Sequence, residues 1–261
     1  MKLVLASTSA YRRELLQRFG LPFEVARPDI DESPLPGETP QATAERLAVE
    51  KARAVAGQFE DALIIGSDQV AYMDSARFGK PGTVERAVAQ LKSMSGRTVI
   101  FHTALAVLNT RTGHVQLDAV PTEVHFRTLS DAEIVRYVDK ERPLDCAGSA
   151  KSEGLGITLL DALAGDDPNA LVGLPLIALA RMLRNEGIAL QKTGRLKDAL
   201  RMYKLSLSLY PMPDLEAHVK GIERKIADDL AQSLGAFEGQ NAGQRDHESD
   251  FNREFSQFSP R

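Results

Sequence analysis

The stretch Lys2-Leu3-Val4-Leu5-Ala6-Ser7-Thr8-Ser9-Ala10-Tyr11-Arg12-Arg13 decides the fold class at the start of the chain. Its first part is an apolar run, which predicts a short buried strand over Lys2–Ala6. The hydroxyl residues after it are typical of a helix start, and Gly20 and Pro22 end the helix predicted over Ala10–Phe19. A strand that leads directly into a helix is typical of α/β folds.

Helices and strands continue to alternate along the chain. Thr39 followed by Pro40 opens a helix that lasts to Gly57. A buried strand is predicted over Ala62–Ser67, ending at Asp68. Two long β runs joined by a short turn favour a mixed sheet over a purely parallel one. The other expected elements are strands Phe23–Ala26, Thr98–Leu108, His114–Arg127 and Ile157–Leu160, and helices Val84–Met94, Ser130–Val138 and Pro175–Glu186.

A change in composition near residue 190 predicts a domain boundary. We expect residues 1–190 to form one α/β domain with a cleft, because strands and helices alternate throughout this part. Residues 191–234, the extension, carry no strand pattern and predict two helices, Lys192–Leu209 and Asp214–Leu234. The polar stretch 235–261 lacks apolar periodicity, so we expect it to be disordered.

Composition and charge narrow the classes of function. The 261-residue chain has a formal net charge of -4 and no long block of Lys or Arg, which argues against polymeric nucleic acid as a partner. A small anionic substrate needs only a few cations and stays compatible. The single cysteine, Cys146, favours a reduced compartment. No stretch approaches the roughly 18 apolar residues of a membrane span, so we expect a cytoplasmic protein without a membrane partner.

Ser7-Thr8-Ser9 with Arg12 and Arg13 predicts an anion-binding site. Free backbone N–H groups at a helix start attract anions. Cations in the first turn of a helix are destabilising, because they lie at the positive end of the helix dipole. An anionic ligand bound beside them would make their charge favourable. Arg12 also shares a helix face with Leu15 and Phe19, which points it inward. The alternative is that both arginines point into solvent or pair with nearby carboxylates.

Lys51 is the second unusual residue, because it falls in the centre of an apolar helix stripe. One interpretation is that its stem lies on the buried face while its ammonium reaches solvent. The other is an ammonium that faces the cleft and contacts phosphate, and helical spacing alone does not decide between them. Lys80, in a Gly-Lys-Pro loop, carries less weight, since a loop lysine is usually solvated. The stripe consists of Ala44, Leu47, Ala48 and Val55.

Two carboxylates stand out. Asp68 follows the predicted strand Ala62–Ser67, and ligands in α/β folds bind beyond the carboxyl ends of strands. An aspartate at this position can equally cap a turn. Glu32 lies in an acidic loop and could supply an oxygen ligand to Mg²⁺. The alternative for Glu32 is a solvated loop without a ligand.

Together these pieces resemble the Maf family of nucleotide pyrophosphatases. The resemblance covers residues 1 to about 187, and the matching strings occur in the family's order. So many ordered matches are more specific than any one of them. The strings are Leu5-Ala6-Ser7-Thr8-Ser9 with Arg12-Arg13, Asp31-Glu32, Glu50-Lys51-Ala52, Gly66-Ser67-Asp68-Gln69, Gly79-Lys80-Pro81, Ala147-Gly148 and Leu171-Val172-Gly173-Leu174-Pro175.

The resemblance implies a two-lobed α/β fold around a mixed sheet and a hydrolase that acts on acid anhydrides. Such an enzyme cleaves a nucleoside triphosphate between its α and β phosphates and requires a divalent cation, Mg²⁺ or Mn²⁺. By position, Asp68 is implied as the proton acceptor and, with Glu32, as a metal ligand. The residues implied to line the triphosphate site are Ser7, Arg12, Arg13, Lys51 and Lys80.

Three positions, Tyr11, Gln69 and Glu153, resemble the branch of the family that acts on 7-methyl-GTP. Methylation at N7 makes guanine cationic, so the face of Tyr11 can bind it by cation–π attraction. The carboxylate of Glu153 can accept hydrogen bonds from the donor edge of the base, although a surface loop residue is the alternative. The competing hypotheses are a pyrophosphatase for dTTP and UTP or for modified nucleotides broadly, and a non-catalytic, septation-linked regulator.

The extension resembles a single tetratricopeptide repeat over Ala180–Pro213, which would share its first helix with the preceding domain. Asp214–Leu234 would then be a capping helix. One repeat cannot form a peptide groove, so we expect the extension to pack on its own domain or on a second subunit, which leaves a homodimer open. The alternative is an ordinary two-helix tail. The matching positions are Gly187, Ala199, Tyr203 and Pro211, and those expected to be buried are Leu196, Leu200, Tyr203 and Leu207.

Overall fold

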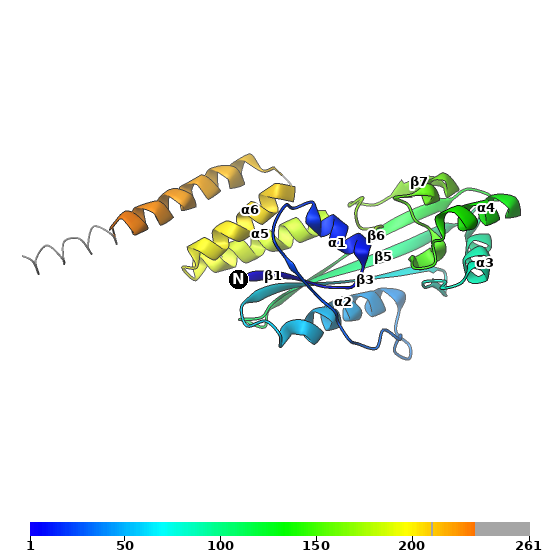
Figure 1. Ribbon diagram of the computed structural model, residues 1–261, viewed down its shortest axis with the longest axis horizontal. Helices are drawn as coiled ribbons and strands as arrows, with labels where there is room; N and C mark the ends of the chain where they lie inside the picture. Colours follow the sequence, from blue (N-terminus) through cyan, green and yellow to red (C-terminus); the bar gives the residue numbers. More distant parts are fainter. Residues whose placement is uncertain (210, 233–261) are drawn as a thin grey trace, which may run out of the picture.

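The computed structural model describes residues 1–209 and 211–232, so the tail expected over 235–261 lies outside the described residues. The fold is built on a seven-stranded mixed sheet in the order β2-β1-β3-β5-β6-β7, with β4 paired to β3 (Figure 1). Strands β1, β2 and β3 run parallel, and the remaining pairs are antiparallel, which confirms the expected mixed sheet. The strands are β1 Lys2–Ala6, β2 Glu24–Ala26, β3 Ala62–Met73, β4 Ala76–Phe78, β5 Thr98–Asn109, β6 Val115–Phe126 and β7 Leu160–Ala164.

With one exception, the helices begin within one residue of their predicted starts. The exception is the helix expected from Lys192: that residue ends α5, a turn follows, and α6 begins at Leu196. Ser9, Thr39 and Ser130 each cap a helix through a side-chain oxygen that accepts from a backbone N–H, and Ser130 forms the full capping box with Glu133. A further helix occupies residues 213–232. The other helices are α1 Ala10–Gln17, α2 Pro40–Ala56, α3 Val84–Met94, α4 Asp131–Glu141, α5 Leu176–Lys192 and α6 Leu196–Leu209, with the short 3₁₀ helices η1 Ala147–Ser149 and η2 Leu155–Leu159.

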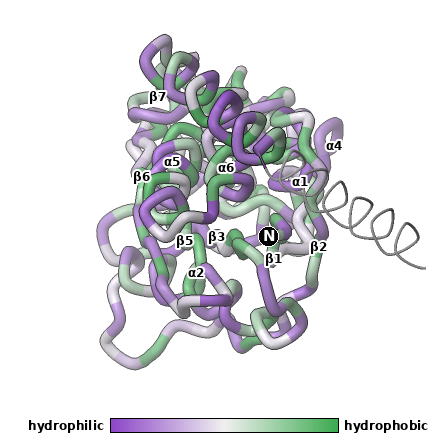
Figure 2. Tube along the Cα trace, turned by 90° about the vertical axis from the view of Figure 1, so that its left-hand side faces the viewer, coloured by the Kyte–Doolittle hydropathy of each residue, from purple (hydrophilic) through white to green (hydrophobic). Residues whose placement is uncertain are grey.

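The central strands are buried on both faces, because helices cover each side of the sheet. Leu63 and Ile65 of β3 belong to the cluster that α1, α5 and α6 complete, whereas Ile64 packs in the cluster on the α2 side. Figure 2 shows α5 and α6 on one side of the central strands and α2 on the other. A separate cluster lies under α3 and α4 and forms the second lobe. Strand alternation therefore decides which helices each residue of β3 faces.

Gly66 allows α2 to lie directly against β3. A Cβ atom at this position would stand 2.1 Å from the carbonyl oxygen of Ala48, which is a backbone atom and cannot turn aside. Lys51 lies one helical turn after Ala48, and Asp68 lies two residues after Gly66 on the same face of the strand. The close approach of helix and strand therefore brings Lys51 beside Asp68.

Three sequence expectations were wrong in detail. Strand β3 does not end before Asp68 but continues to Met73, so Asp68 lies inside a strand rather than at its end. The expected strand Ile157–Leu160 is displaced along the chain: 157–159 belong to η2, and β7 begins at Leu160. The short strand β4 was not predicted, because three residues after a turn are too few to show a period.

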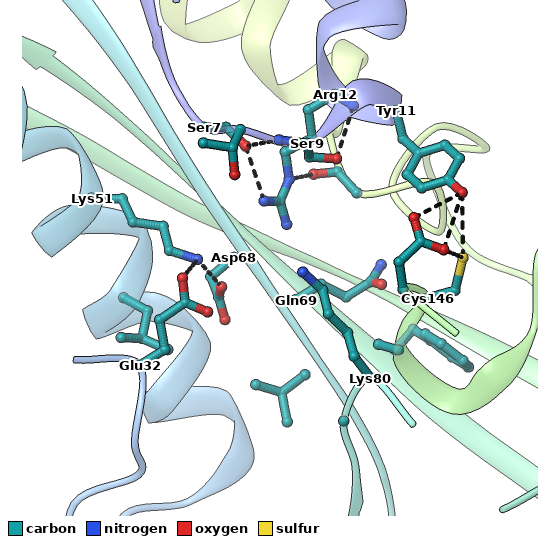
Figure 3. Close-up of a pocket in the computed structure, with 18 of the residues that line it drawn as sticks. Ser7, Ser9, Tyr11, Arg12, Glu32, Lys51, Asp68, Gln69, Lys80 and Cys146 are labelled. Atoms are coloured by element: carbon teal, nitrogen blue, oxygen red, sulfur yellow. Dashed lines mark hydrogen bonds and ion pairs between the residues drawn. The ribbon is translucent and has the colours of Figure 1, made fainter. Parts of the chain in front are cut away.

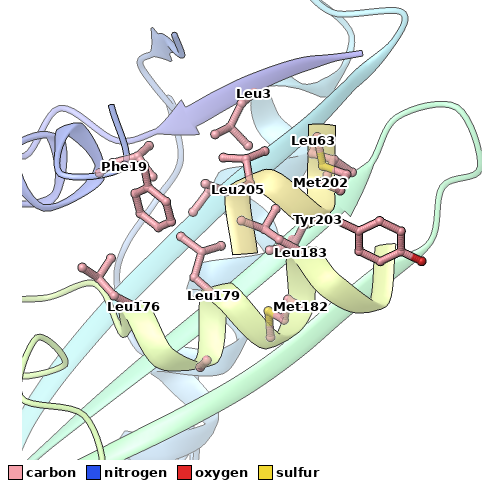
Figure 4. Packing of buried hydrophobic residues seen from close by; sticks show 14 of the residues in the cluster. Leu3, Phe19, Leu63, Leu176, Leu179, Met182, Leu183, Met202, Tyr203 and Leu205 are labelled. Carbon is pink, nitrogen blue, oxygen red and sulfur yellow. The ribbon is translucent and has the colours of Figure 1, made fainter. Parts of the chain in front are cut away.

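The extension packs on its own chain. Helices α5 and α6 form a hairpin in which Gly187 contacts Tyr203, since a Cβ at Gly187 would stand 2.7 Å from the Tyr203 ring. Tyr203 is 1% exposed, as expected, whereas Leu196, Leu200 and Leu207 are only partly buried. Figure 4 shows Met202, Tyr203 and Leu205 beside residues of α5, β1 and β3. The fully buried positions of α6 are instead Ala199, Met202, Leu205 and Ser206, together with Tyr203.

One further property of the helices bears on membranes. Within residues 1–209 and 211–232, none of them combines the length and the apolar character needed to cross a bilayer.

Candidate functional site

A break in strand pairing marks the site. Strand β1 pairs with β3 as far as Gly66, and β4 pairs with β3 from Ala71 onward. Residues Ser67–Val70 of β3 therefore pair with neither β1 nor β4. A pocket of about 870 Å³ opens here, a size typical of small-molecule sites. Its wall comes from residues 7–12 after β1, the acidic loop 27–34, α2, β3, the segment 77–80, the loop 145–153 and residues 171–173.

Ser7 and Arg12 form one side of the pocket, as Figure 3 shows. Ser7 directly follows β1, and its Oγ accepts from the backbone N–H of Ser9 at 3.1 Å and from Nη1 of Arg12 at 3.5 Å. Nε of Arg12 donates to the carbonyl oxygen of Gly173 at 2.7 Å. Burial lowers the pKa of Arg12, although the charges of Asp68 and Glu32 act against this. An arginine held in this way is a fixed cation for an anionic ligand.

Arg13 does not share this position. Its side chain is exposed and lies outside the pocket lining, so the geometry gives no support to its implied place at a triphosphate. On α1, residues 12 and 13 point about 100° apart, which explains why one enters the pocket and the other does not.

Lys51 bridges two carboxylates at the floor of the pocket. Its Nζ lies 2.6 Å from Oδ1 of Asp68 and 2.9 Å from Oε1 of Glu32 (Figure 3). The side chains of Lys51 and Asp68 are 6% and 9% exposed, whereas that of Glu32 is 59% exposed. The interpretation in which Lys51 extends to solvent is therefore wrong, because its ammonium is buried in the pocket wall.

The two carboxylates differ in acidity. Desolvation raises the pKa of Asp68, and the opposing charges of Lys51 and Arg12 do not fully offset it. Desolvation also acts to raise the pKa of Glu32, but the hydrogen bond and charge of Lys51 outweigh it, so that pKa is lowered. A pair of carboxyl groups whose pKa values are moved apart can divide proton transfer and charge stabilisation between them.

Gln69 lies on the opposite face of β3 from Asp68. Its Nε2 donates to Oγ1 of Thr103 at 2.9 Å and to the carbonyl oxygens of Ala170 and Leu171 at 3.1 and 3.0 Å. These contacts use the amide donors, and Oε1 has no hydrogen-bond partner in the described part of the chain. Gln69 can therefore offer an acceptor to a ligand. Lys80 is exposed and lines the pocket just after β4.

The end of the pocket beyond Tyr11 is acidic. The hydroxyl of Tyr11 donates to the carboxylate of Asp145, at 3.4 and 3.3 Å from its two oxygens. Burial is the main cause that raises the pKa of Tyr11, so the phenol keeps its proton. Glu153, from the loop between η1 and η2, is exposed but lines the pocket. Glu153 is thus a surface loop residue that also lines the pocket, and its role in base recognition stays a prediction.

Asp145 and Arg77 are among the charged residues of the wall that sequence reasoning missed. Arg77 donates to Oγ1 of Thr43 at 2.9 Å and to the carbonyl oxygen of Glu38, and so ties β4 to the start of α2. A loop aspartate and an arginine on a three-residue strand carry no periodic signal, so the sequence alone offered no reason to select them.

Two carboxylates of the pocket, Glu32 and Asp68, are the candidate ligands of a divalent cation. No group of three or more His, Cys, Asp or Glu side chains that could hold a metal ion occurs among residues 1–209 and 211–232. Glu32 and Asp68 nevertheless meet at one ammonium, so their oxygens lie close enough to share a cation. Mg²⁺ usually takes one or two carboxylates and completes its shell with phosphates and water. The pair therefore fits a cation that arrives with a phosphate ligand.

Comparisons with known proteins agree with this chemistry. Residues 2–186 match the family described as "Maf-like protein". A protein of Aromatoleum aromaticum named "7-methyl-GTP pyrophosphatase" is 74% identical over 189 residues, which cover 72% of this chain and 97% of that protein. A protein of the same name from Thiobacillus denitrificans is 61% identical over 186 residues, which cover 71% of this chain and 92% of that protein. Another, from Burkholderia thailandensis, is 60% identical over 192 residues, which cover 72% of this chain and 89% of that protein.

Proposed function

The chain belongs to the Maf family, and from this we propose that it hydrolyses 7-methyl-GTP to 7-methyl-GMP and diphosphate, removing a modified nucleotide from the pool. One observation carries the proposal: Asp68, a buried carboxylate with a raised pKa, lies beside two cations in a pocket whose far end is acidic. This reaction needs a general base, cations that bind the phosphates, and an acidic end that binds the nucleobase.

The reaction follows from the positions of these residues. A water molecule attacks the α phosphorus, one of its protons passes to Asp68, and the bond to the bridging oxygen of the diphosphate breaks. Lys51 and Arg12 stabilise the negative charge that builds on the phosphate oxygens, and Lys80 at the pocket edge does the same for the leaving diphosphate. Ser7 holds Arg12 in place through its hydroxyl.

A divalent cation, Mg²⁺ or Mn²⁺, is the proposed cofactor. Glu32 and Asp68 would hold it, because they are the two carboxylates that converge in the pocket. When bound, the cation supplies positive charge to the phosphate oxygens. Lys51 holds these two carboxylates toward each other, with its Nζ 2.6 Å from Oδ1 of Asp68 and 2.9 Å from Oε1 of Glu32.

Recognition of the base is assigned to three residues. Guanine presents N–H donors on its Watson–Crick edge, and the Glu153 carboxylate and Oε1 of Gln69 can accept them. The ring of Tyr11 supplies a π face for the cationic base. Thymine and uracil would place carbonyl oxygens against the acidic end, which is unfavourable. This contrast favours a methylated guanine over dTTP or UTP.

A panel of nucleotides tests the proposal directly. Release of diphosphate would be measured for 7-methyl-GTP, GTP, dTTP and UTP, with and without added Mg²⁺ or Mn²⁺. We expect the highest kcat/KM for 7-methyl-GTP and dependence on the cation. Preference for dTTP or UTP, equal rates on all four, or binding without hydrolysis would each overturn the assignment.

Glu153→Gln probes the base-binding end. The substitution turns a charge-assisted hydrogen bond into a neutral one and keeps the shape of the side chain. Charged hydrogen bonds contribute about 1.5–3 kcal/mol against about 1 for neutral ones, so the ratio of kcat/KM for 7-methyl-GTP over GTP should fall roughly tenfold. Steady-state kinetics on both substrates provide the measurement. An unchanged ratio would remove Glu153 from base recognition.

We also propose that the protein is cytoplasmic. For the C-terminal helices, we propose a single tetratricopeptide-like repeat over 180–213, followed by a capping helix. The contact between Gly187 and Tyr203 supports the repeat, because it joins a small and an aromatic residue across the helix pair. Leu215, Val219 and Ile222 of the last helix pack on the same cluster, as a cap would. This packing covers the apolar face of the repeat, so the proposal needs no second subunit.

A further inference from the structure

The two ends of the pocket offer different charges to a ligand. The end beside Asp68 contains the cations Arg12, Lys51 and Lys80, and Lys51 is paired there with the carboxylates of Asp68 and Glu32. The end beside Tyr11 contains two carboxylates, Asp145 and Glu153, and neither is paired with a cation in the described part of the chain. A ligand that fits this pocket is therefore anionic at one end and tolerates, or carries, positive charge at the other.

Asp145 is a carboxylate that contacts Tyr11 directly. It follows α4, lines the pocket and accepts from the Tyr11 hydroxyl through both oxygens, at 3.4 and 3.3 Å. The neighbouring thiol of Cys146 contributes no charge, because burial raises its pKa to about 11. The negative charge at this end thus comes from the carboxylates alone, and Asp145 fixes both the ring and part of the field around it.

Lys151 acts on the same ring with the opposite charge. Its Nζ lies 5.7 Å from the centroid of the Tyr11 ring, within the range of a cation–π contact. The ammonium is held by Glu141 at 3.0 Å, and Lys151 is not among the residues that line the pocket. A positive charge therefore lies against Tyr11 from outside the pocket, where it opposes the binding of a second cation to the ring.

We propose that Asp145 is a specificity-determining residue that selects bases carrying a positive charge, and that Lys151 limits this preference. The inference rests on the proposed function and deepens it, because it names the residues that set how strongly the positive charge of the base is preferred. A neutral base of the same shape would lose the attraction to Asp145 and also the cation–π part of its contact with Tyr11. The effect of Asp145 is therefore measured by how far the ratio between a cationic and a neutral base of equal shape changes when Asp145 alone is altered.

The experiment compares 7-methyl-GTP with 7-methyl-7-deaza-GTP, which has the same methyl group and no positive charge, at mildly acidic pH. The charge preference is the ratio of the two kcat/KM values. Asp145→Asn keeps an acceptor for Tyr11 and removes only the charge, so this ratio should fall about fivefold to tenfold, as expected for two unit charges that interact across water at close range. Lys151→Met should raise it by about twofold to fivefold. Asp139→Asn, an exposed residue of α4, is the matched control and should leave it unchanged.

The two variants must move the ratio in opposite directions, which a general loss of structure cannot do. An unchanged ratio in Asp145→Asn, or the same direction of change in both, would overturn the role of Asp145. Failure of the proposed function has a different signature: the parent protein itself would hydrolyse GTP as well as 7-methyl-GTP. A parent that prefers 7-methyl-GTP but accepts the deaza analogue equally would show that the methyl group is recognised, and would overturn the inference alone.

Discussion

Replacing Asp68 with asparagine is expected to lower turnover by about 100- to 10,000-fold, the usual contribution of a general base. In the parent, Nζ of Lys51 donates to Oδ1 of Asp68 at 2.6 Å. Asparagine keeps the shape of the side chain and can still accept this hydrogen bond, but it cannot take a proton at neutral pH. Binding of the nucleotide depends on cations that remain in place, so KM should change little. Single-turnover kinetics and a direct binding titration separate the two effects.

Asp74→Asn is the matched control, because it is the same substitution on an exposed turn just after β3 and outside the pocket. The pH profile gives an independent check. A base works only when deprotonated, and burial raises the pKa of Asp68, so activity of the parent should be lost at a higher pH on acidification than an ordinary aspartate predicts. Near-parental turnover in Asp68→Asn would remove this residue from the mechanism.

The position of Asp68 shows where sequence reasoning succeeded and where it failed. The apolar run before it correctly predicted a buried strand, because β3 is covered by helices on both faces. The expected strand end was wrong, since β3 continues for five residues beyond Asp68, to Met73. The strand that does end near the pocket is β1, which pairs with β3 no further than Gly66. The length of β3 depends on its partners, since β5 pairs with it beyond Gly66 and β4 joins at Ala71, and these partners are distant in the sequence or too short to predict.

Local signals were reliable where the cause is local. The caps at Ser9, Thr39 and Ser130 were predicted because each side chain bonds to its own helix. Lys51 could be recognised as unusual but not placed, because its partner Glu32 comes from a loop whose path depends on the rest of the fold. Asp145 gave no signal at all, since its position beside Tyr11 joins segments 134 residues apart.

The extension is tied to the core of the catalytic domain. Met202, Tyr203 and Leu205 of α6 belong to the same buried cluster as Leu3 of β1 and Leu183 of α5 (Figure 4). Arg195 also pairs with Asp61, just before β3, at 3.1 Å. Helix α5 itself runs to Lys192, across the boundary expected at residue 190. We therefore propose that the extension and the preceding residues form one folding unit, rather than two independent domains.

Deleting residues 191–261 should accordingly lower the melting temperature by about 10 °C or more. Burial of each large apolar side chain contributes about 1.5–3 kcal/mol, and several such contacts would be lost from the cluster. For a domain of this size, each 1 kcal/mol shifts the melting temperature by about 2–4 °C. Activity of the folded fraction should stay close to that of the parent, because, among residues 1–209 and 211–232, none beyond Gly173 lines the pocket. Thermal unfolding and kcat/KM per folded molecule are the two measurements.

Two further variants keep this prediction testable if the truncated protein is insoluble. Deleting only 233–261 leaves α6 and the helix over 213–232 in place and should not change the melting temperature. Tyr203→Ala opens a cavity beside Gly187 and should destabilise the full chain by about 3–5 kcal/mol, as large-to-small substitutions of buried aromatic residues do. A melting temperature unaffected by Tyr203→Ala would contradict the shared core. A truncated protein that folds but does not hydrolyse nucleotide would show instead that the extension completes the active site, because the pocket residues it retains would then be insufficient for catalysis.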